Sequence, residues 1–122
     1  MARVNKILVV DDDPVIVKLL QNILSAEDFQ VITAGDGLEA MTQVKEHKPD
    51  LVILDVMMPK INGYDVCRHL KFDSPYKNIP IILLTVRDRE IDPRMGRMIG
   101  VDYIRKPVNR SKLLSRIKQV LK

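Results

Sequence analysis

The hydrophobic residues of the chain form two alternating patterns. Continuous apolar runs rich in β-branched residues occupy positions 7–10, 51–54 and 79–84, and shorter or weaker runs occupy 31–34 and 103–104. Runs without polar alternation are typical of strands that are covered on both faces, as in a parallel sheet. Between these runs the apolar residues recur at the spacing of an amphipathic helix. The pattern therefore predicts strand and helix alternating five times.

Capping residues mark where several of these helices begin. Asp13 followed by Pro14 suits the N-cap and the first helical position, and Asn109 suits the N-cap of the last helix. The first helix carries one apolar stripe: Val15, Ile16, Leu19, Leu20, Ile23 and Leu24. The helix expected between the fourth and fifth strands is the weakest, because it contains Pro93 and Gly96, and glycine alone costs about 1 kcal/mol in a helix interior. We expect it to be short and to begin near Pro93.

Alternation of strands and helices predicts an α/β fold in which five helices flank a single doubly wound, five-stranded parallel sheet. The chain has 122 residues, which fits one domain with a core from about residue 5 to residue 122. Cys67 is the one cysteine, so an internal disulfide framework is excluded, and no apolar run is long enough for a membrane span. We therefore expect a cytoplasmic domain without a membrane partner.

The charge is distributed unevenly along the chain. Residues 1–61 contain 6 Lys and Arg against 10 Asp and Glu, whereas residues 62–122 contain 14 against 6, and the net charge is +4. A basic half is compatible with nucleic-acid binding, and an acidic half with a local cluster of carboxylates. The charge alone leaves both possibilities open.

Polar side chains follow the predicted strands at the ends where parallel sheets bind ligands. The first strand is followed by Asp11, Asp12 and Asp13, the third by Asp55, the fourth by Thr85 and the fifth by Lys106. Neighbouring carboxylates repel each other unless a cation lies among them, and an oxygen-only set suits Mg²⁺. A lysine ammonium and a threonine hydroxyl can hold phosphoryl oxygens. The set therefore predicts Mg²⁺-assisted phosphoryl transfer to an aspartate.

These residues stand within longer motifs that recur in order along the chain. Asp11-Asp12, the segment 54–59 (Leu-Asp-Val-Met-Met-Pro), Asn62-Gly63-Tyr64, Leu84-Thr85 and Lys106-Pro107 together resemble the receiver domain of bacterial response regulators. The resemblance covers about residues 5–122. It implies a flavodoxin-like fold with strand order 2-1-3-4-5 and a receiver domain spanning 1–122. We expect no output domain within these residues, which are either a stand-alone receiver or a fragment of a longer regulator.

The resemblance also implies a role for each residue of the set. Asp55 is the expected phosphoacceptor, and the expected metal ligands are Asp11, Asp12, Asp55 and the backbone carbonyl of Met57. Thr85 and Lys106 are expected to stabilise the phosphoryl group, Tyr103 to act with Thr85 as a switch, and the Lys106–Pro107 peptide bond to be cis. The phosphoryl donor would be a sensor histidine kinase or a histidine phosphotransfer protein. The face made by the fourth helix, the fifth strand and the last helix would then bind a downstream protein or a second copy of the chain.

Two positions depart from the receiver pattern. Receivers have a small residue after the threonine that ends the fourth strand, but here it is Val86, and Arg87 follows. We expect both residues to control access to Asp55, the valine by narrowing the entrance and the arginine by shielding or holding a phosphoryl oxygen. The segment between Thr85 and Lys106 is also one residue shorter than the usual pattern.

Two other functions fit parts of the sequence. Asp11 to Val15 match the D-x-D-x-[TV] pattern of haloacid-dehalogenase-like phosphatases, in which Asp11 would be the nucleophile and Asp55 would have no role. Alternatively, a receiver-like fold with an idle site would use its basic half to bind nucleic acid or an acidic partner. The receiver resemblance favours a phosphorylated switch rather than a turnover enzyme, with the basic surface contacting an acidic protein and not nucleic acid directly.

Overall fold

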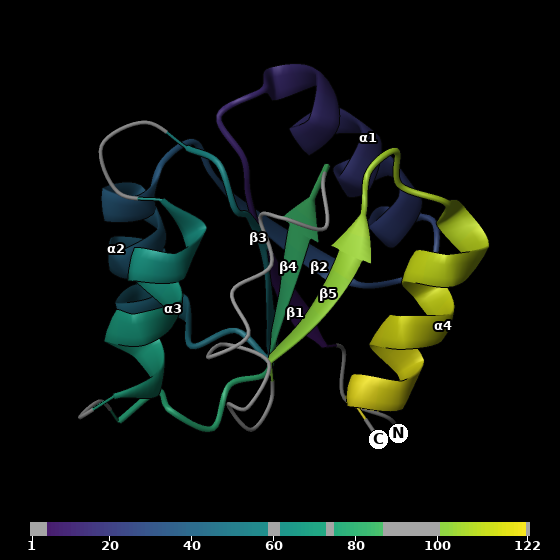
Figure 1. The fold of residues 1–122 in the computed structure, drawn as a ribbon. Coiled ribbons are helices and arrows are strands. Elements are labelled where there is room, and N and C mark those ends of the chain that lie inside the picture. The colour runs from purple at the N-terminus through teal and green to yellow at the C-terminus, as the bar shows by residue number, and fades with distance from the viewer. Residues whose placement is uncertain (1–4, 59–61, 73–74, 87–100, 122) are drawn as a thin grey trace.

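Five parallel strands form one sheet in the computed structural model, which describes residues 5–58, 62–72, 75–86 and 101–121 (Figure 1). The strands are β1 (Lys6–Val10), β2 (Gln30–Ala34), β3 (Leu51–Asp55), β4 (Ile81–Thr85) and β5 (Val101–Arg105). Their order across the sheet is β2-β1-β3-β4-β5, and every neighbouring pair is parallel. The expected α/β fold and the strand order 2-1-3-4-5 are confirmed.

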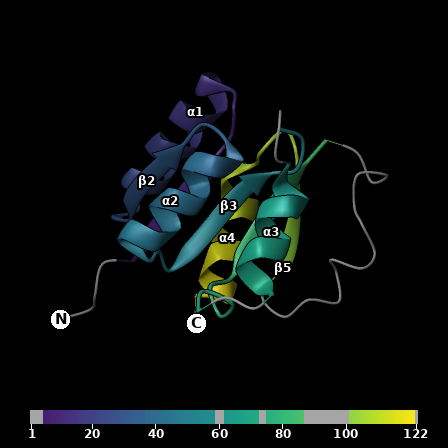
Figure 2. The same ribbon diagram turned by 90° about the vertical axis from the view of Figure 1, so that its left-hand side faces the viewer.

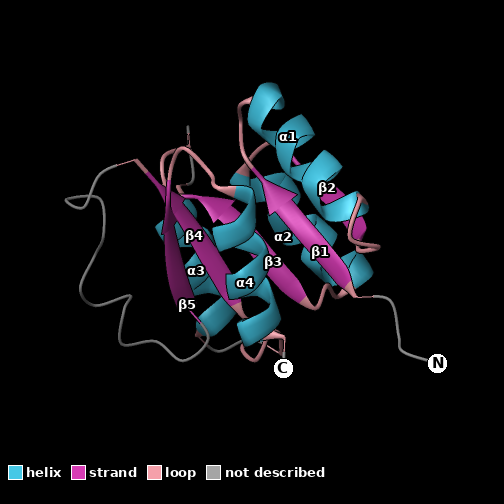
Figure 3. Cartoon of the chain, turned by 90° about the vertical axis from the view of Figure 1, so that its right-hand side faces the viewer, coloured by secondary structure: helices cyan, strands magenta, loops and turns pink. Residues whose placement is uncertain are grey.

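The described helices cover both faces of the sheet. They are α1 (Pro14–Ser25), α2 (Gly37–His47), α3 (Gly63–Lys71) and α4 (Arg110–Val120). Helices α2 and α3 lie on one face (Figure 2), and α1 and α4 lie on the other (Figure 3). The sheet is therefore doubly wound. The helix expected near Pro93 falls within residues 87–100, outside the described part of the chain, so the label α4 belongs to the helix that the sequence predicts last.

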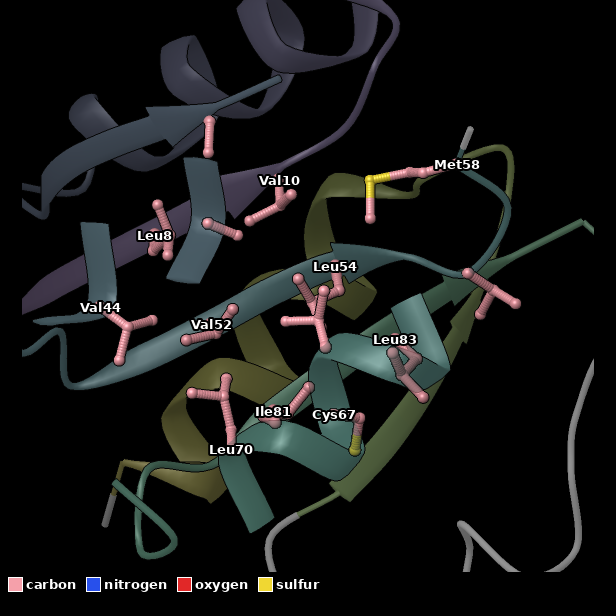
Figure 4. Packing of buried hydrophobic residues seen from close by; sticks show 14 residues of the cluster. Leu8, Val10, Val44, Val52, Leu54, Met58, Cys67, Leu70, Ile81 and Leu83 are labelled. Atoms are coloured by element: carbon pink, nitrogen blue, oxygen red, sulfur yellow. The ribbon is translucent and has the colours of Figure 1, made fainter. Parts of the chain in front are cut away.

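The strands are buried because the sheet separates two hydrophobic clusters. Alternate residues of a strand point to opposite faces. Leu8, Val52 and Leu83 pack toward α2 and α3 in the cluster of Figure 4, whereas Val9 and Ile53 pack toward α1 and α4. Every residue of β3 and β4 is buried, as their unbroken apolar runs predict. The edge strand β5 is only half-buried over most of its length.

Helix α1 buries less of its apolar stripe than the sequence pattern indicates. Asp13 caps the helix as predicted, since its carboxylate accepts the N–H of Val15 at 2.9 Å. Leu20 and Leu24 are fully buried, but Val15 is 71% exposed and Leu19 is 43% exposed. The stripe spans more of the helix circumference than one face of a sheet covers, so its outer edge faces solvent.

The other described helices also begin at side-chain caps. Asp36, Asn62 and Asn109 each accept a backbone N–H from the first turn of the helix that follows. Such caps satisfy donors that an α-helix leaves without an internal partner. They fix the point at which α2, α3 and α4 start after the strand that precedes each of them.

The described helices carry one cysteine, and none of them resembles a membrane span. Cys67 is a free, fully buried thiol on α3, and burial raises its pKa to about 11. None of the helices in the described ranges is long and apolar enough to cross a bilayer.

Candidate functional site

The register of β1 and β3 places their carboxyl ends side by side. Val10 lies opposite Leu54, so the residues that follow, Asp11 and Asp55, come next to each other. The N–H of Asp11 donates to the carbonyl of Ala34 in β2 at 3.2 Å, which keeps Asp11 in line with the sheet. Two carboxylates thus stand at one edge because neighbouring parallel strands end together.

Asp11, Asp12 and Asp55 form one carboxylate cluster. One carboxylate oxygen from each residue lies within 4.8 Å of the others. Asp11 and Asp55 are buried, with 2% and 7% of their surfaces exposed, whereas Asp12 is open to solvent. The cluster does not include Asp13, whose carboxylate caps α1. The structure therefore separates acids that stand in a row in the sequence.

Lys106 places an ammonium group between two of these carboxylates. Its Nζ lies 3.2 Å from Asp11 Oδ2 and 3.2 Å from Asp55 Oδ1. Its backbone N–H donates to the carbonyl of Thr85 at 2.7 Å, and its peptide bond to Pro107 is cis. Burial disfavours the charged ammonium, but the two carboxylates outweigh burial and raise the pKa of Lys106. The lysine therefore supplies a fixed positive charge to the cluster.

Asp55 has a strongly altered acidity. Burial, followed by the charge of Asp11, raises its pKa from an ordinary 3.8 to about 6. The Lys106 ammonium lowers the pKa, as does the Met57 N–H, which lies 3.4 Å from Asp55 Oδ1, but neither cancels the rise. The charge of Lys106 therefore does not offset the combined effect of burial and of the Asp11 carboxylate on the pKa of Asp55.

The donor set fits a hard divalent cation. The cluster offers carboxylate oxygens only, since the two histidines, His47 and His69, are exposed on α2 and α3 and Cys67 is buried in the core. Such a set, with Asp12 open to solvent, suits Mg²⁺, which binds one or two carboxylates and retains waters. A cation among these oxygens would offset the repulsion from Asp11 that helps to raise the pKa of Asp55.

The remaining predicted site residues belong to the neighbouring strands or follow them directly. Thr85, the last residue of β4, is buried, and Tyr103 is half-buried on β5. Met57 and Val86 follow β3 and β4 closely, and their exposed fractions are 61% and 48%. Arg87, the second residue expected to control access, lies outside the described residues.

The structure adds Gly63 to the surroundings of Asp55. The sequence identifies this glycine only as part of a motif that opens a helix. In the fold, a β-carbon at this position would meet the backbone of Asp55 and Val56, and the Gly63 N–H donates to the Val56 carbonyl at 2.9 Å. Its one sequence signal is a glycine directly after the N-cap Asn62, a place where better helix formers are available.

The sequence is similar to a known family and to longer regulators of that family. A family model described as the response regulator receiver domain matches residues 7–118. The DNA-binding response regulator MtrA of Mycolicibacterium smegmatis is 42% identical over 118 residues, which cover 96% of this chain and 50% of that protein. The alkaline phosphatase synthesis transcriptional regulatory protein PhoP of Bacillus subtilis is 43% identical over 118 residues, with coverage of 96% and 48%. The chain thus spans about half the length of these curated relatives.

The fold is similar to solved receiver structures over nearly its whole length. The chemotaxis response regulator CheY4 of Vibrio cholerae superposes with a TM-score of 0.88 at 30% identity, covering 98% of this chain and all of the other. The signal receiver domain of a signal transduction histidine kinase from Syntrophus aciditrophicus gives a TM-score of 0.84 at 36% identity, with coverage of 96% and 89%. The motif resemblance, the sheet order and the family match agree, and the chain belongs to the response regulator receiver domain family of two-component systems.

Proposed function

We propose that this chain is the phosphoacceptor switch of a two-component or phosphorelay system and that Asp55 receives the phosphoryl group. The observation that carries the proposal is the carboxylate cluster of Asp11, Asp12 and Asp55, two members of which, Asp11 and Asp55, each lie 3.2 Å from Lys106 Nζ. The donor is a histidine kinase or a histidine phosphotransfer protein in the cytoplasm. The chain modifies itself and does not turn over a small substrate.

The transfer follows from the chemistry of these groups. A carboxylate oxygen of Asp55 attacks the phosphorus of the donor phosphohistidine, the P–N bond breaks, and its electron pair stays on the imidazole nitrogen. Attack requires the ionised carboxylate, which Lys106 favours by its charge. Asp11, Asp12, Asp55 and the backbone carbonyl of Met57 would hold Mg²⁺. When bound, this ion supplies charge neutralisation for the phosphoryl oxygens.

Thr85 and Lys106 hold the product in this proposal. The Thr85 carbonyl accepts the N–H of Lys106 at 2.7 Å, so a direct backbone hydrogen bond joins the two residues. The Thr85 hydroxyl donates to one phosphoryl oxygen and the Lys106 ammonium contacts another. Val86, directly after Thr85 and half exposed, narrows access to the acyl phosphate and slows its hydrolysis.

In this proposal, the negative charge that phosphorylation adds at Asp55 alters the surface formed by β5 and α4, and Thr85 and Tyr103 transmit the change. Phosphorylation places a new dianionic group beside Thr85 and biases the strand pair β4–β5, on which Tyr103 lies opposite Leu83. The surface formed by β5 and α4 then contacts a downstream protein or a second copy. Exposed basic residues on α4, namely Arg110, Lys112 and Lys118, suit an acidic partner.

The test is phosphorylation with Mg²⁺ and acetyl phosphate, followed by intact mass spectrometry. We expect one phosphoryl adduct on the wild type and none on Asp55→Asn. Asp13→Asn is the matched control, because it makes the same chemical change outside the cluster and asparagine is an equally good N-cap. An adduct that survives Asp55→Asn and maps to Asp11 would overturn the proposal in favour of the phosphatase-like alternative.

A further inference from the structure

Gly63 lies where only a hydrogen atom fits. It is the first residue of α3, and a β-carbon built there would collide with the carbonyl oxygen of Asp55 and lie 3.0 Å from Val56 Cα. Both neighbours are backbone atoms of the strand end, which cannot rotate away as a flexible side chain does. The helix therefore approaches the phosphoacceptor strand as closely as it does because residue 63 has no side chain.

The same glycine forms a backbone hydrogen bond to Val56, the residue before Met57. Its N–H donates to the Val56 carbonyl at 2.9 Å, although donors in the first turn of a helix have no partner within the helix. Val56 directly follows β3 and Gly63 is the first residue of α3, so this hydrogen bond joins the end of the strand to the start of the helix. The Val56 N–H in turn donates to the Leu84 carbonyl at 3.0 Å, which ties the junction to β4.

We propose that Gly63 is a positioning residue for the phosphoacceptor site: the contact with Asp55 and the bond to Val56 set where the Asp55 carboxylate and the Met57 carbonyl stand relative to each other. The inference rests on the proposed function. Asp55 Oδ1 is 3.2 Å from Lys106 Nζ and 3.4 Å from the Met57 N–H, so a shift of the strand end changes both contacts. Mg²⁺ demands near-ideal octahedral geometry, and small displacements of its ligands weaken binding.

The first test compares two Gly→Ala variants. We expect Gly63→Ala to weaken Mg²⁺ binding at least tenfold by titration calorimetry and to slow phosphorylation by acetyl phosphate at saturating Mg²⁺. Gly35→Ala is the matched control, because a β-carbon there lies 3.8 Å from the flexible Glu39 carboxylate and nothing closer. Ile117→Val, in the core on the other face of the sheet, controls for lost stability and should leave Mg²⁺ affinity unchanged.

The second test needs no variant and decides the matter if Gly63→Ala does not fold. In the wild type, amide exchange of Gly63 followed by NMR should be slow and should become slower when Mg²⁺ binds, whereas the capped Lys112 amide of α4 should not respond. Mg²⁺ affinity of Gly63→Ala equal to wild type, or a Gly63 amide indifferent to Mg²⁺, would overturn the inference. A wild type that neither binds Mg²⁺ nor accepts a phosphoryl group would overturn the proposed function instead.

Discussion

Leu54 and Asp55 are neighbours on β3 and both are buried, yet burial has opposite consequences for them. Leu54 is fully buried in the cluster covered by α2 and α3, where its side chain leaves water for apolar contacts. Asp55 loses hydration that an ionised carboxylate needs, and its pKa rises to about 6. One residue stabilises the fold, and the next makes the metal-free fold less stable at neutral pH.

The difference shows how this fold holds a charged carboxylate at the end of a buried strand. The buried apolar residues of β3 and its pairing with β1 place Asp55 beside Asp11 and largely out of water. A cation held among these oxygens would relieve this electrostatic strain. A functional edge built on a rigid core is therefore expected to show a conflict between stability and activity.

The largest effect on stability should come from substitution of Leu54, the apolar member of this pair. Leu54→Ala removes a fully buried side chain and should lower the free energy of unfolding by about 2–5 kcal/mol. The loss should be the same at pH 5 and pH 8, because no charge changes. Urea denaturation measures it, with Leu19→Ala on the half-exposed side of α1 as the control. A loss no greater than that of Leu19→Ala would contradict the packing described here.

Substitution of Asp55, the other member of the pair, should change the free energy of unfolding in the opposite direction. Asp55→Asn should stabilise the metal-free protein at pH 8 by up to about 3 kcal/mol, because a pKa rise from 3.8 to about 6 is worth about 1.4 kcal/mol per unit. The pKa of Asp55 is higher in the folded protein than in the unfolded chain, so protonated Asp55 contributes favourably to the free energy of unfolding. This contribution is complete below about pH 4 and is lost as the pH rises through 6. The gain in the variant should therefore vanish at pH 4, in thermal or urea denaturation with a chelator present.

Addition of Mg²⁺ supplies the control for this experiment. The ion should raise the unfolding free energy of the wild type at pH 8, by about 2.7 kcal/mol at a hundred times its Kd, and should do so far less in Asp55→Asn. The stability difference between the two proteins should then shrink or reverse. A variant that is less stable than the wild type in chelator at pH 8 would show that burial of Asp55 carries no cost.

The comparison also explains what could be predicted from the sequence. Unbroken apolar runs predicted β1, β3 and β4, because strands covered on both faces have no polar positions. The acids at the ends of those runs predicted the cluster, because parallel strands end at one edge of the sheet. Asp11 and Asp55 thus followed from local pattern and topology together.

What the sequence left open depends on contacts between elements. The exposure of Val15 and Leu19 depends on how much of α1 the sheet covers, which the helical period alone does not define. The place of Gly63 against the Asp55 backbone depends on the packing of α3 at the strand end. The rise in the pKa of Asp55 depends on how far its side chain is buried and on its distance to Lys106. Neither quantity can be predicted from the spacing of residues along the sequence.

The smallest predicted effect separates two adjacent acids that look equivalent in sequence. Asp13→Ala removes the cap of α1 and should cost about 1 kcal/mol of stability with no change in Mg²⁺ affinity. Asp12→Ala removes an exposed member of the cluster and should do the reverse, weakening Mg²⁺ binding with little change in metal-free stability. Thermal denaturation in chelator and Mg²⁺ titration calorimetry measure the two properties on the same samples. Loss of Mg²⁺ affinity in Asp13→Ala but not in Asp12→Ala would instead identify Asp13 as the metal ligand.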